Sequence, residues 1–360
     1  MAKNKRDWAI VVGVEVYPDP SFGNSLRAPE NDAKSFRDWL VSESGGNLLK
    51  SHVKLILSSD YRQPFRDARR AKPTAARITD EFKKLDAIAE ENQRKGQGSK
   101  VGRRLYLYFA GHGCAPRNPN EDEALLLTAN ATGIALGENI PGKNYADWYR
   151  SSGYFKEVLL FMDCCRDVLA AAPINGIPNK PIIGPAALDQ GRAFFGFATK
   201  WSRKAREKPF NDRWQGVFTT ALLTGLAGAA ADPKDGRITT ASLKDYLYNS
   251  WLEFLSPQDL ADPEVPKEPE VWYRPQDDRG NFEIAKVAVP TFPVTISLPA
   301  GLQGRTIEIM DHEFQVVADT VVGTAEWLVN LKKGKYFLNL GPGQGKRFDV
   351  VGTGAEHVQV

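Results

Sequence analysis

The chain has 360 residues, of which 42% are hydrophobic and 25% are charged, values typical of a folded globular protein. They exclude a disordered, collagen-like or coiled-coil chain, and the length suggests about two domains. The 47 Lys and Arg residues nearly balance the 44 Asp and Glu residues. The resulting net charge of +3 gives no reason to expect a nucleic acid or an anionic membrane as a partner.

The cysteines and the hydropathy pattern indicate the cellular compartment of the protein. Three Cys in a chain of this length do not form a disulfide scaffold, and the adjacent Cys164 and Cys165 favour a reducing environment. The N-terminus lacks the apolar stretch of a signal peptide, and no run approaches 18 apolar residues. We therefore expect a cytoplasmic protein without a membrane segment.

Short apolar runs alternate with helical patterns over the first two thirds of the chain. Buried strands are predicted at residues 8–16, 53–57, 104–110, 158–162 and 193–199. Helices are predicted from a cap at residues 31–32 to about 41, from a Thr74 cap onward, and at 216–230 and 240–255. This alternation predicts an α/β fold with a mostly parallel sheet and helices on both faces.

The last third changes character twice. Residues 259–278 combine four prolines with acidic side chains and are predicted to be irregular before a last strand at 281–287. From Pro290 the chain alternates apolar and polar residues with Gly and Pro punctuation, as in a small all-β sandwich. We expect domains at 1–289 and 290–360.

Reactive residues follow two of the predicted strands. His112, between two glycines, follows the third strand, and Cys164 and Cys165 follow the fourth. A free thiol has a pKa of ~8.5 and needs a neighbouring base, and parallel strands lie only ~4.8 Å apart. An imidazole and a thiol at neighbouring strand ends can form a nucleophilic pair, with the Gly113 N–H as an oxyanion donor.

The chain resembles the caspase-like cysteine peptidases, the group of caspases, metacaspases and bacterial relatives, over roughly residues 6–287. The matching segments are 24–33, 108–113 with its GHG, 159–167 with its D-x-C, 216–223 and 238–247. The resemblance implies a caspase–hemoglobinase fold with a mostly parallel six-stranded sheet. It also implies a dyad of His112 and Cys165 with no third orienting carboxylate, and makes Cys164 a neighbour of the nucleophile.

The resemblance also locates the pocket for the residue before the cut bond. Caspases that cut after Asp have a Gln and two Arg at the positions that match Asp163, Leu26 and Glu207 here. Two carboxylates in their place favour Arg, and less well Lys, through charge-assisted bonds. Metacaspases carry an acidic run where residues 200–203 read KWSR, so Glu207 must turn inward to take part.

Other interpretations of these residues are weaker. A zinc site built from Cys114, Cys164, Cys165 and His112 lacks the usual C-x₂₋₄-C pair, and Cys114 and Cys164 fit plain packing. Asp163 can be a hydrogen-bonding group at a strand end, Glu207 a solvated loop residue, and the basic run 95–104 a solvated connection. We expect no cofactor; some metacaspases need calcium, but the sequence has no clear acidic cluster dedicated to it.

The segment after the nucleophile suggests control of activity. Residues 170–192 are long and Pro-rich and contain Lys180 and Arg192, with further basic sites at 200–208. In relatives the corresponding loop is often cut during activation. We expect a zymogen, or a chain restrained until it is processed by itself, by an upstream activating protease or through a regulatory partner.

Together these features predict a cysteine endopeptidase that cleaves protein or peptide substrates after a basic residue. One alternative is a catalytically silent caspase-like scaffold whose β module binds protein partners, and another is a hydrolase of non-peptide esters or thioesters. The in-frame His and Cys argue against the first, and the acidic pocket argues against the second. A bacterial defence or regulated-death pathway is an expectation from the resemblance alone.

Overall fold

A computed structural model describes residues 3–23, 25–62, 65, 67–118, 123–177, 191–199, 205–210, 212–289, 291–350 and 356–360, with the backbone alone at 167–171. The chain divides into two compact units. The larger one comprises Met1–Ala231 and Arg237–Val287, and the smaller one Asp232–Gly236 and Ala288–Val360.

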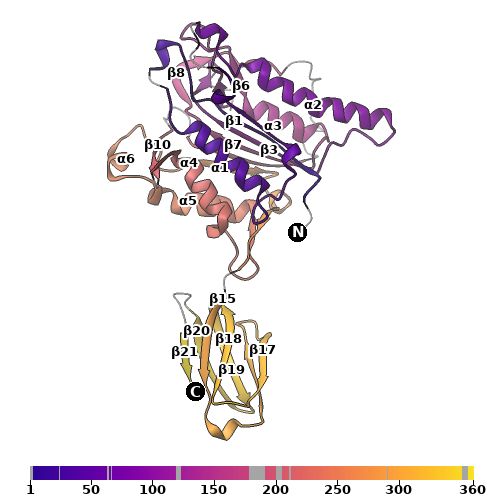
Figure 1. Ribbon diagram of the computed structural model, residues 1–360, viewed down its shortest axis with the longest axis vertical. Helices are drawn as coiled ribbons and strands as arrows, with labels where there is room; N and C mark the ends of the chain where they lie inside the picture. The colour runs from indigo at the N-terminus through magenta and orange to yellow at the C-terminus, as the bar shows by residue number, and fades with distance from the viewer. Residues whose placement is uncertain are drawn as a thin grey trace. The chain divides into compact units, whose positions relative to one another are not determined.

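The larger unit is built on a six-stranded sheet of order β13-β9-β7-β3-β1-β2 (Figure 1). Its strands are β1 (Asp7–Gly13), β2 (Val53–Leu57), β3 (Arg104–Ala110), β7 (Glu157–Asp163), β9 (Arg192–Phe197) and β13 (Glu270–Arg274). All are parallel except β13, which is antiparallel to β9. The predicted mostly parallel six-stranded sheet is confirmed.

Alternation along the strands gives the sheet two buried faces. In β3, Leu105 and Leu107 pack into one hydrophobic core with α2 (Ala75–Arg94) and α3 (Gly142–Ser151). Tyr106 and Tyr108 belong to a second core, which includes residues of α1 (Pro29–Val41), α4 (Val217–Thr224) and α5 (Thr240–Ser250). Side chains of successive strand residues point to opposite faces, which explains why the strand sequences are apolar throughout.

The starts of two helices can be compared with the caps predicted from sequence. The Thr74 side chain accepts the Arg77 N–H and caps α2 as predicted. In contrast, α1 begins at Pro29 and not after residues 31–32, because proline fits the first helical position and needs no N–H there. Asp32 therefore lies in the first turn of α1 as a buried residue.

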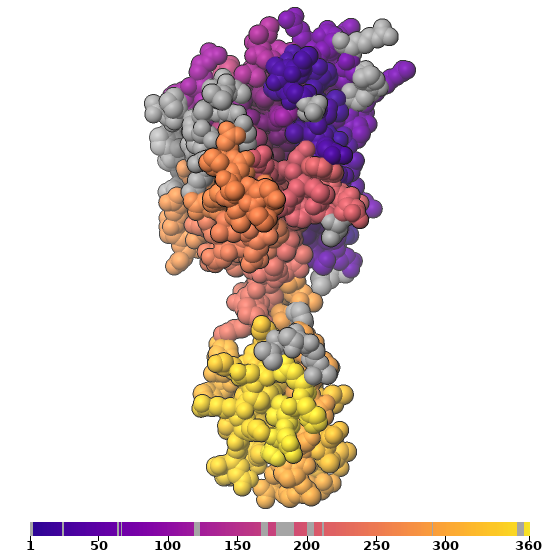
Figure 2. All heavy atoms as spheres, turned by 90° about the vertical axis from the view of Figure 1, so that its left-hand side faces the viewer, coloured from indigo at the N-terminus to yellow at the C-terminus, as the bar shows by residue number. Residues whose placement is uncertain are grey.

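The segment predicted to be irregular contains regular structure. It includes the last residues of the short helix α6 (Pro257–Ala261) and the whole edge strand β13, and it lies on the surface of the larger unit, orange in Figure 2. The flanking Pro269 and Pro275 obscured β13, although proline is tolerated beside an edge strand. The expected last strand corresponds to β14 (Glu283–Lys286), which pairs with β12 (Arg237–Thr239) outside the main sheet.

Small sheets lie beside the main one. A four-stranded sheet has the order β6-β5-β4-β8, and β10 pairs with β11 in a hairpin. Their bounds are β4 (Gly113–Pro116), β5 (Leu125–Leu127), β6 (Asn139–Pro141), β8 (Asp167–Ala172), β10 (Glu207–Phe210) and β11 (Arg213–Gly216). Because β4 follows β3 and β8 follows β7 within a few residues, this sheet begins where the main strands end.

The smaller unit has a hydrophobic core of its own between two sheets, of orders β18-β15-β21 and β17-β16-β19-β20. The strands are β15 (Thr291–Ser297), β16 (Thr306–Met310), β17 (Val316–Val321), β18 (Glu326–Lys332), β19 (Gly334–Gly341), β20 (Gln344–Val350) and β21 (Glu356–Gln359). The predicted β-rich C-terminal region is confirmed. No helix in the described ranges has both the length and the apolar character needed to cross a bilayer.

Candidate active site

The segments that follow β3 and β7 run side by side. Ala110 at the end of β3 pairs with Asp163 at the end of β7, and Cys114 in β4 pairs with Asp167 in β8. His112 and Cys165 are the middle residues between these two paired positions. The backbone register therefore places the two predicted dyad residues opposite each other at the carboxyl edge of the sheet.

Gly113 lies directly against the backbone of the predicted nucleophile. A Cβ on Gly113 would be 2.5 Å from the Cys165 carbonyl oxygen and 2.8 Å from the Cys164 Sγ, so only glycine fits. The His112 carbonyl accepts the Leu127 N–H at 2.9 Å, which directs the polar backbone groups of residue 112 toward β5. Since these groups alternate along a strand, those of Gly113 are directed to the other side, where Cys165 lies.

The three thiols differ in exposure. Cys114 and Cys164 are buried in a hydrophobic core, whereas Cys165 is half-buried. Burial raises the pKa of the Cys164 thiol well above its usual value, which keeps it protonated and inert. The Cys165 Sγ accepts the backbone N–H of Ala205 at 3.2 Å, so the chain leading into β10 passes the predicted nucleophile.

The His112 imidazole packs against two aromatic rings. Its centroid lies 4.6 Å from that of Tyr17 and 5.6 Å from that of Phe22. Burial lowers the pKa of His112 to about 4, so the ring is neutral near pH 7 and can accept a proton. Its Nε2 atom is buried and has no hydrogen-bond partner among the residues that the structure describes.

Two buried carboxylates, Asp32 and Asp163, meet at Gly216. An Oδ2 of each lies within 3.0 Å of the place that a Gly216 Cβ would occupy. Asp163 accepts the Thr219 hydroxyl at 2.6 Å and the Thr219 N–H at 3.1 Å, and Asp32 accepts the Gly216 N–H at 2.9 Å. The second oxygen of Asp32 is buried and has no hydrogen-bond partner among the described residues.

Burial and like charge set the protonation of this pair. Burial raises the pKa of Asp163 to about 6, opposed by the hydrogen bonds from Thr219. Burial and then the Asp163 charge raise the pKa of Asp32 well above its usual value. In the described part of the chain, no Lys or Arg side chain forms an ion pair with either carboxylate. The pair thus forms a buried acidic cluster that a cation would stabilise.

Glu207 turns toward the same region. Its carboxylate accepts the backbone N–H groups of Arg27 and Ala28 at 2.9–3.2 Å, just before α1, and its charge contributes to the raised pKa values of Asp32 and Asp163. Leu26, the third predicted pocket position, is half-buried and packs against a hydrophobic core. Asp32, Asp163 and Glu207 are called the acidic pocket from here on.

Comparison with known proteins identifies the family of the chain. The family model of the Caspase domain matches residues 6–247. The chain belongs to the caspase family. A solved structure of a protein from Geobacter sulfurreducens also matches, at 16% sequence identity and a TM-score of 0.44, over 79% of this chain and 98% of that one. No curated protein matches the chain.

Two residues of this caspase domain were missed from sequence. The sequence pattern predicts a helix cap at Asp32, whereas Pro29 starts the helix earlier and leaves Asp32 buried in its first turn. The pattern predicts a strand boundary at Tyr17, whereas the Tyr17 hydroxyl accepts the His112 backbone N–H. Both contacts join positions distant in sequence, which no local pattern reports.

The predicted processing sites are only partly described. Lys180 and residues 200–203 lie outside the described residues. Arg192 begins β9, where its N–H donates to the Lys156 carbonyl at 3.0 Å and its guanidinium pairs with the buried Glu157. A peptide bond held inside the central sheet is a poor cleavage site, which disfavours Arg192 as the point of processing.

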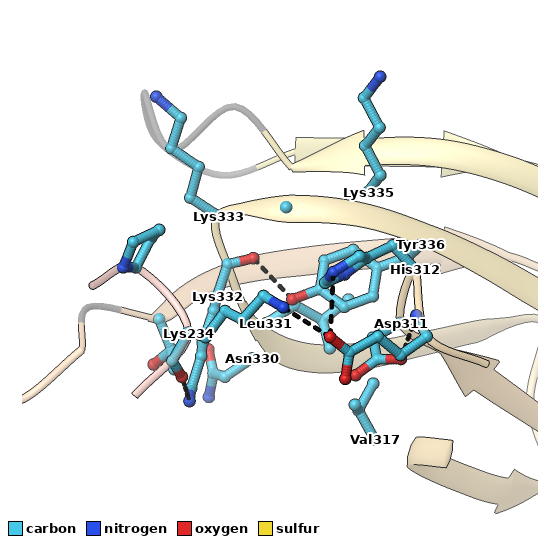
Figure 3. A pocket seen from close by; sticks show the side chains of 14 residues that line it. Lys234, Asp311, His312, Val317, Asn330, Leu331, Lys332, Lys333, Lys335 and Tyr336 are labelled. Carbon is cyan, nitrogen blue, oxygen red and sulfur yellow. Dashed lines mark hydrogen bonds and ion pairs between the residues drawn. The ribbon is translucent and has the colours of Figure 1, made fainter. Parts of the chain in front are cut away.

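In the part of the chain that the structure describes, two further features bear on metal ligation and on a second cavity. The described residues contain no group of three or more His, Cys, Asp or Glu side chains placed to hold a metal, and the four residues of the zinc alternative are all described. The smaller unit has a cavity of ≈ 480 Å³ in which Glu313 pairs with Lys234 and His312, while Lys333 and Lys335 point out of it (Figure 3). Its lining has four lysines against two carboxylates, so the charges cancel only in part.

Proposed function

We propose that this caspase domain is a cysteine endopeptidase that cleaves protein and peptide substrates after arginine, and less well after lysine. The observation that carries the proposal is the pair of buried carboxylates, Asp32 and Asp163, of which Asp163 precedes the predicted nucleophile by two residues. Asp32 keeps one buried oxygen without a partner among the described residues. A substrate guanidinium supplies both the missing hydrogen bond and the opposite charge.

The charge of the acidic pocket decides between substrate classes. A guanidinium carries five N–H donors in a planar fork and can bond two carboxylates at once, whereas a lysine ammonium is a point charge that is harder to desolvate. A substrate aspartate would meet the negative charge of Glu207 and of the Asp32–Asp163 pair, at a cost of several kcal/mol in a partly desolvated pocket. This ordering supports Arg over Lys and both over Asp.

The dyad supplies a two-step mechanism. Neutral His112 accepts the Cys165 proton as the thiolate attacks the carbonyl carbon, and the oxyanion receives N–H groups from Gly113 and Cys165. The C–N bond then breaks, and the leaving amine takes the proton from His112. Water, deprotonated by His112, attacks the thioester to release the acid and regenerate the thiol.

The proposal includes a restraint on Cys165 in the resting chain. Ala205 contacts the Cys165 sulfur through its backbone N–H, and this contact supports a chain that is restrained until processing or a partner shifts the segment before β10. Glu207 lies two residues further on, so the same shift would readjust the acidic pocket.

Hydrolysis of short fluorogenic peptides ending in Arg, Lys, Asp or Ala tests the proposal, with and without calcium. We expect wild type to prefer Arg and Cys165→Ala to be inactive, while Cys164→Ala keeps activity because its thiol is buried. Cleavage after Asp would contradict the pocket assignment. Inactivity on every peptide, persisting after limited proteolysis of residues 170–192, would favour the silent scaffold.

A further inference from the structure

The Tyr17 hydroxyl occupies a place in the backbone ladder beside β4. The His112 N–H donates to the Tyr17 Oη at 2.9 Å, and the hydroxyl donates to the Leu127 carbonyl at 3.0 Å. The Leu127 N–H returns a direct bond to the His112 carbonyl at 2.9 Å. In an ordinary antiparallel pair both bonds are direct, so here one of the two is relayed through a side chain.

The same side chain also holds the imidazole. The Tyr17 and His112 rings meet edge to face with a 65° interplanar angle, and Phe22 stacks on His112 at 26°. Tyr17 is buried, and its ring packs on Phe22 with centroids 5.5 Å apart. Burial raises the pKa of Tyr17 well above its usual value, so the hydroxyl keeps the proton that it donates to Leu127.

Gly111 leaves room for this hydroxyl. A Cβ on Gly111 would lie 2.5 Å from the Tyr17 Oη, and the residue has a φ of +153°, which glycine adopts far more readily than other residues. The first glycine of the GHG segment thus admits Tyr17, and the second admits the Cys165 backbone. Two glycines and one tyrosine fix the backbone of His112 on both sides.

We propose that Tyr17 is the positioning residue of the dyad and takes the orienting role that a third carboxylate has in other nucleophilic sites. No carboxylate among the described residues hydrogen-bonds to the His112 imidazole. Tyr17 instead fixes the His112 backbone through its hydroxyl and the ring through its edge. This inference rests on the proposed function, because it assumes that His112 serves Cys165.

Tyr17→Phe removes the hydroxyl that relays the hydrogen bond and keeps the aromatic ring at position 17. We expect kcat on an arginine peptide to fall about tenfold to a hundredfold, as for small displacements of a catalytic group, with KM within about twofold. Tyr145→Phe is the matched control, because the Tyr145 hydroxyl is also buried and bonds Thr79 at 3.0 Å, away from the dyad. It should lose comparable thermal stability and keep kcat.

Gly111→Ala is a second variant that keeps Tyr17 and displaces its hydroxyl. We expect the same fall in kcat at unchanged KM. If Tyr17→Phe and Gly111→Ala both fold and keep kcat within about twofold of wild type, the proposal is overturned. A fall in kcat that Tyr145→Phe reproduces overturns it as well, because the effect is then general destabilisation.

A titration of the His112 ring by NMR separates this proposal from the proposed function. The chain has four His residues, so His112→Gln assigns the signal. The wild-type midpoint is expected near the pKa of about 4, and Tyr17→Phe should raise it, because an imidazole whose backbone is no longer held by the relay can move toward water. If wild type cleaves no peptide even after limited proteolysis of residues 170–192, the proposed function fails, while an unchanged midpoint in Tyr17→Phe rejects the positioning role.

Discussion

Burial sets the protonation of individual groups around Cys165. It lowers the pKa of His112 to about 4 and raises that of Asp163 to about 6, so near pH 7 the imidazole is neutral and Asp163 is mostly charged. These are the states that a general base and a cation-binding carboxylate need. The two groups therefore affect different kinetic constants.

The kinetic consequence is a pH dependence that divides between KM and kcat. As the pH falls through about 6, Asp163 gains a proton and loses its attraction for guanidinium, so kcat/KM on an arginine peptide should fall. At saturating substrate kcat should persist to lower pH, because His112 is protonated only near about 4. Rate profiles of wild type and Asp163→Asn test this; a limb near 6 that survives in Asp163→Asn would contradict it.

Asp163 also carries a cost in stability. Its pKa is raised in the folded chain, so the stability that protonated Asp163 contributes is fully present below about pH 4 and is lost as the pH rises through about 6. Asp163→Asn should therefore gain stability relative to wild type between pH 4 and pH 7, by on the order of 2 kcal/mol. Urea unfolding at both pH values measures the difference, and a pH-independent difference would exclude a raised pKa.

At the scale of elements, β10 links the acidic pocket to the surface. Arg206 pairs with Asp262 and Lys208 with Asp259 at 3.7 Å, on the segment that contains α6, while Glu207 between them turns toward α1. Glu207 also pairs in register with Gly216, the residue against which both buried carboxylates lie. The two outward ion pairs hold the start of β10 on either side of Glu207, its first residue, which belongs to the acidic pocket.

Arg206→Gln combined with Lys208→Gln should loosen β10 and raise KM on an arginine peptide about threefold to tenfold, with kcat little changed. Loss of two cations makes the region more negative, which by itself would lower KM for an arginine peptide. A rise in KM therefore reports a displaced Glu207. Arg279→Gln, which removes an exposed cation paired with Asp277, is the control. Equal KM values in the double variant and wild type would show that the ion pairs do not position Glu207.

The elements also show what local sequence can and cannot predict. Apolar runs located the five parallel strands, and the D-x-C and GHG segments at their ends located His112 and Cys165, because these signals are contiguous. The edge strand β13 was missed between two prolines, and the start of α1 was displaced. Asp32 entered the acidic pocket only through a hydrogen bond from Gly216, 184 positions away. Contacts of that separation depend on packing and leave no local pattern.

At the scale of the whole molecule, the two units have separate hydrophobic cores. Cores on both faces of the main sheet belong to the larger unit, and a third core lies between the two sheets of the smaller one. The smaller unit also contains Asp232–Gly236, so this division differs from the domains predicted at 1–289 and 290–360, which stay a prediction; each unit nevertheless has a core of its own. Each unit is therefore expected to unfold on its own.

Calorimetry should show two unfolding transitions in the full chain. Leu160→Ala, in the main sheet, and Ile309→Ala, in the smaller unit, each remove a fully buried side chain and should cost about 2–5 kcal/mol. Each variant should lower one transition and leave the other in place. A single transition that both variants shift equally would mean that the units fold as one.

The most direct test of the central claim is covalent labelling with peptidyl chloromethyl ketones that end in arginine or in aspartate, followed by mass spectrometry. A thiolate displaces the chloride of such a reagent, so the adduct marks the nucleophile and the rate reports the pocket. We predict one adduct, on Cys165, formed faster with the arginine reagent and slowed in Asp163→Asn. An adduct on Cys164 or Cys114, or faster labelling by the aspartate reagent, would contradict the account.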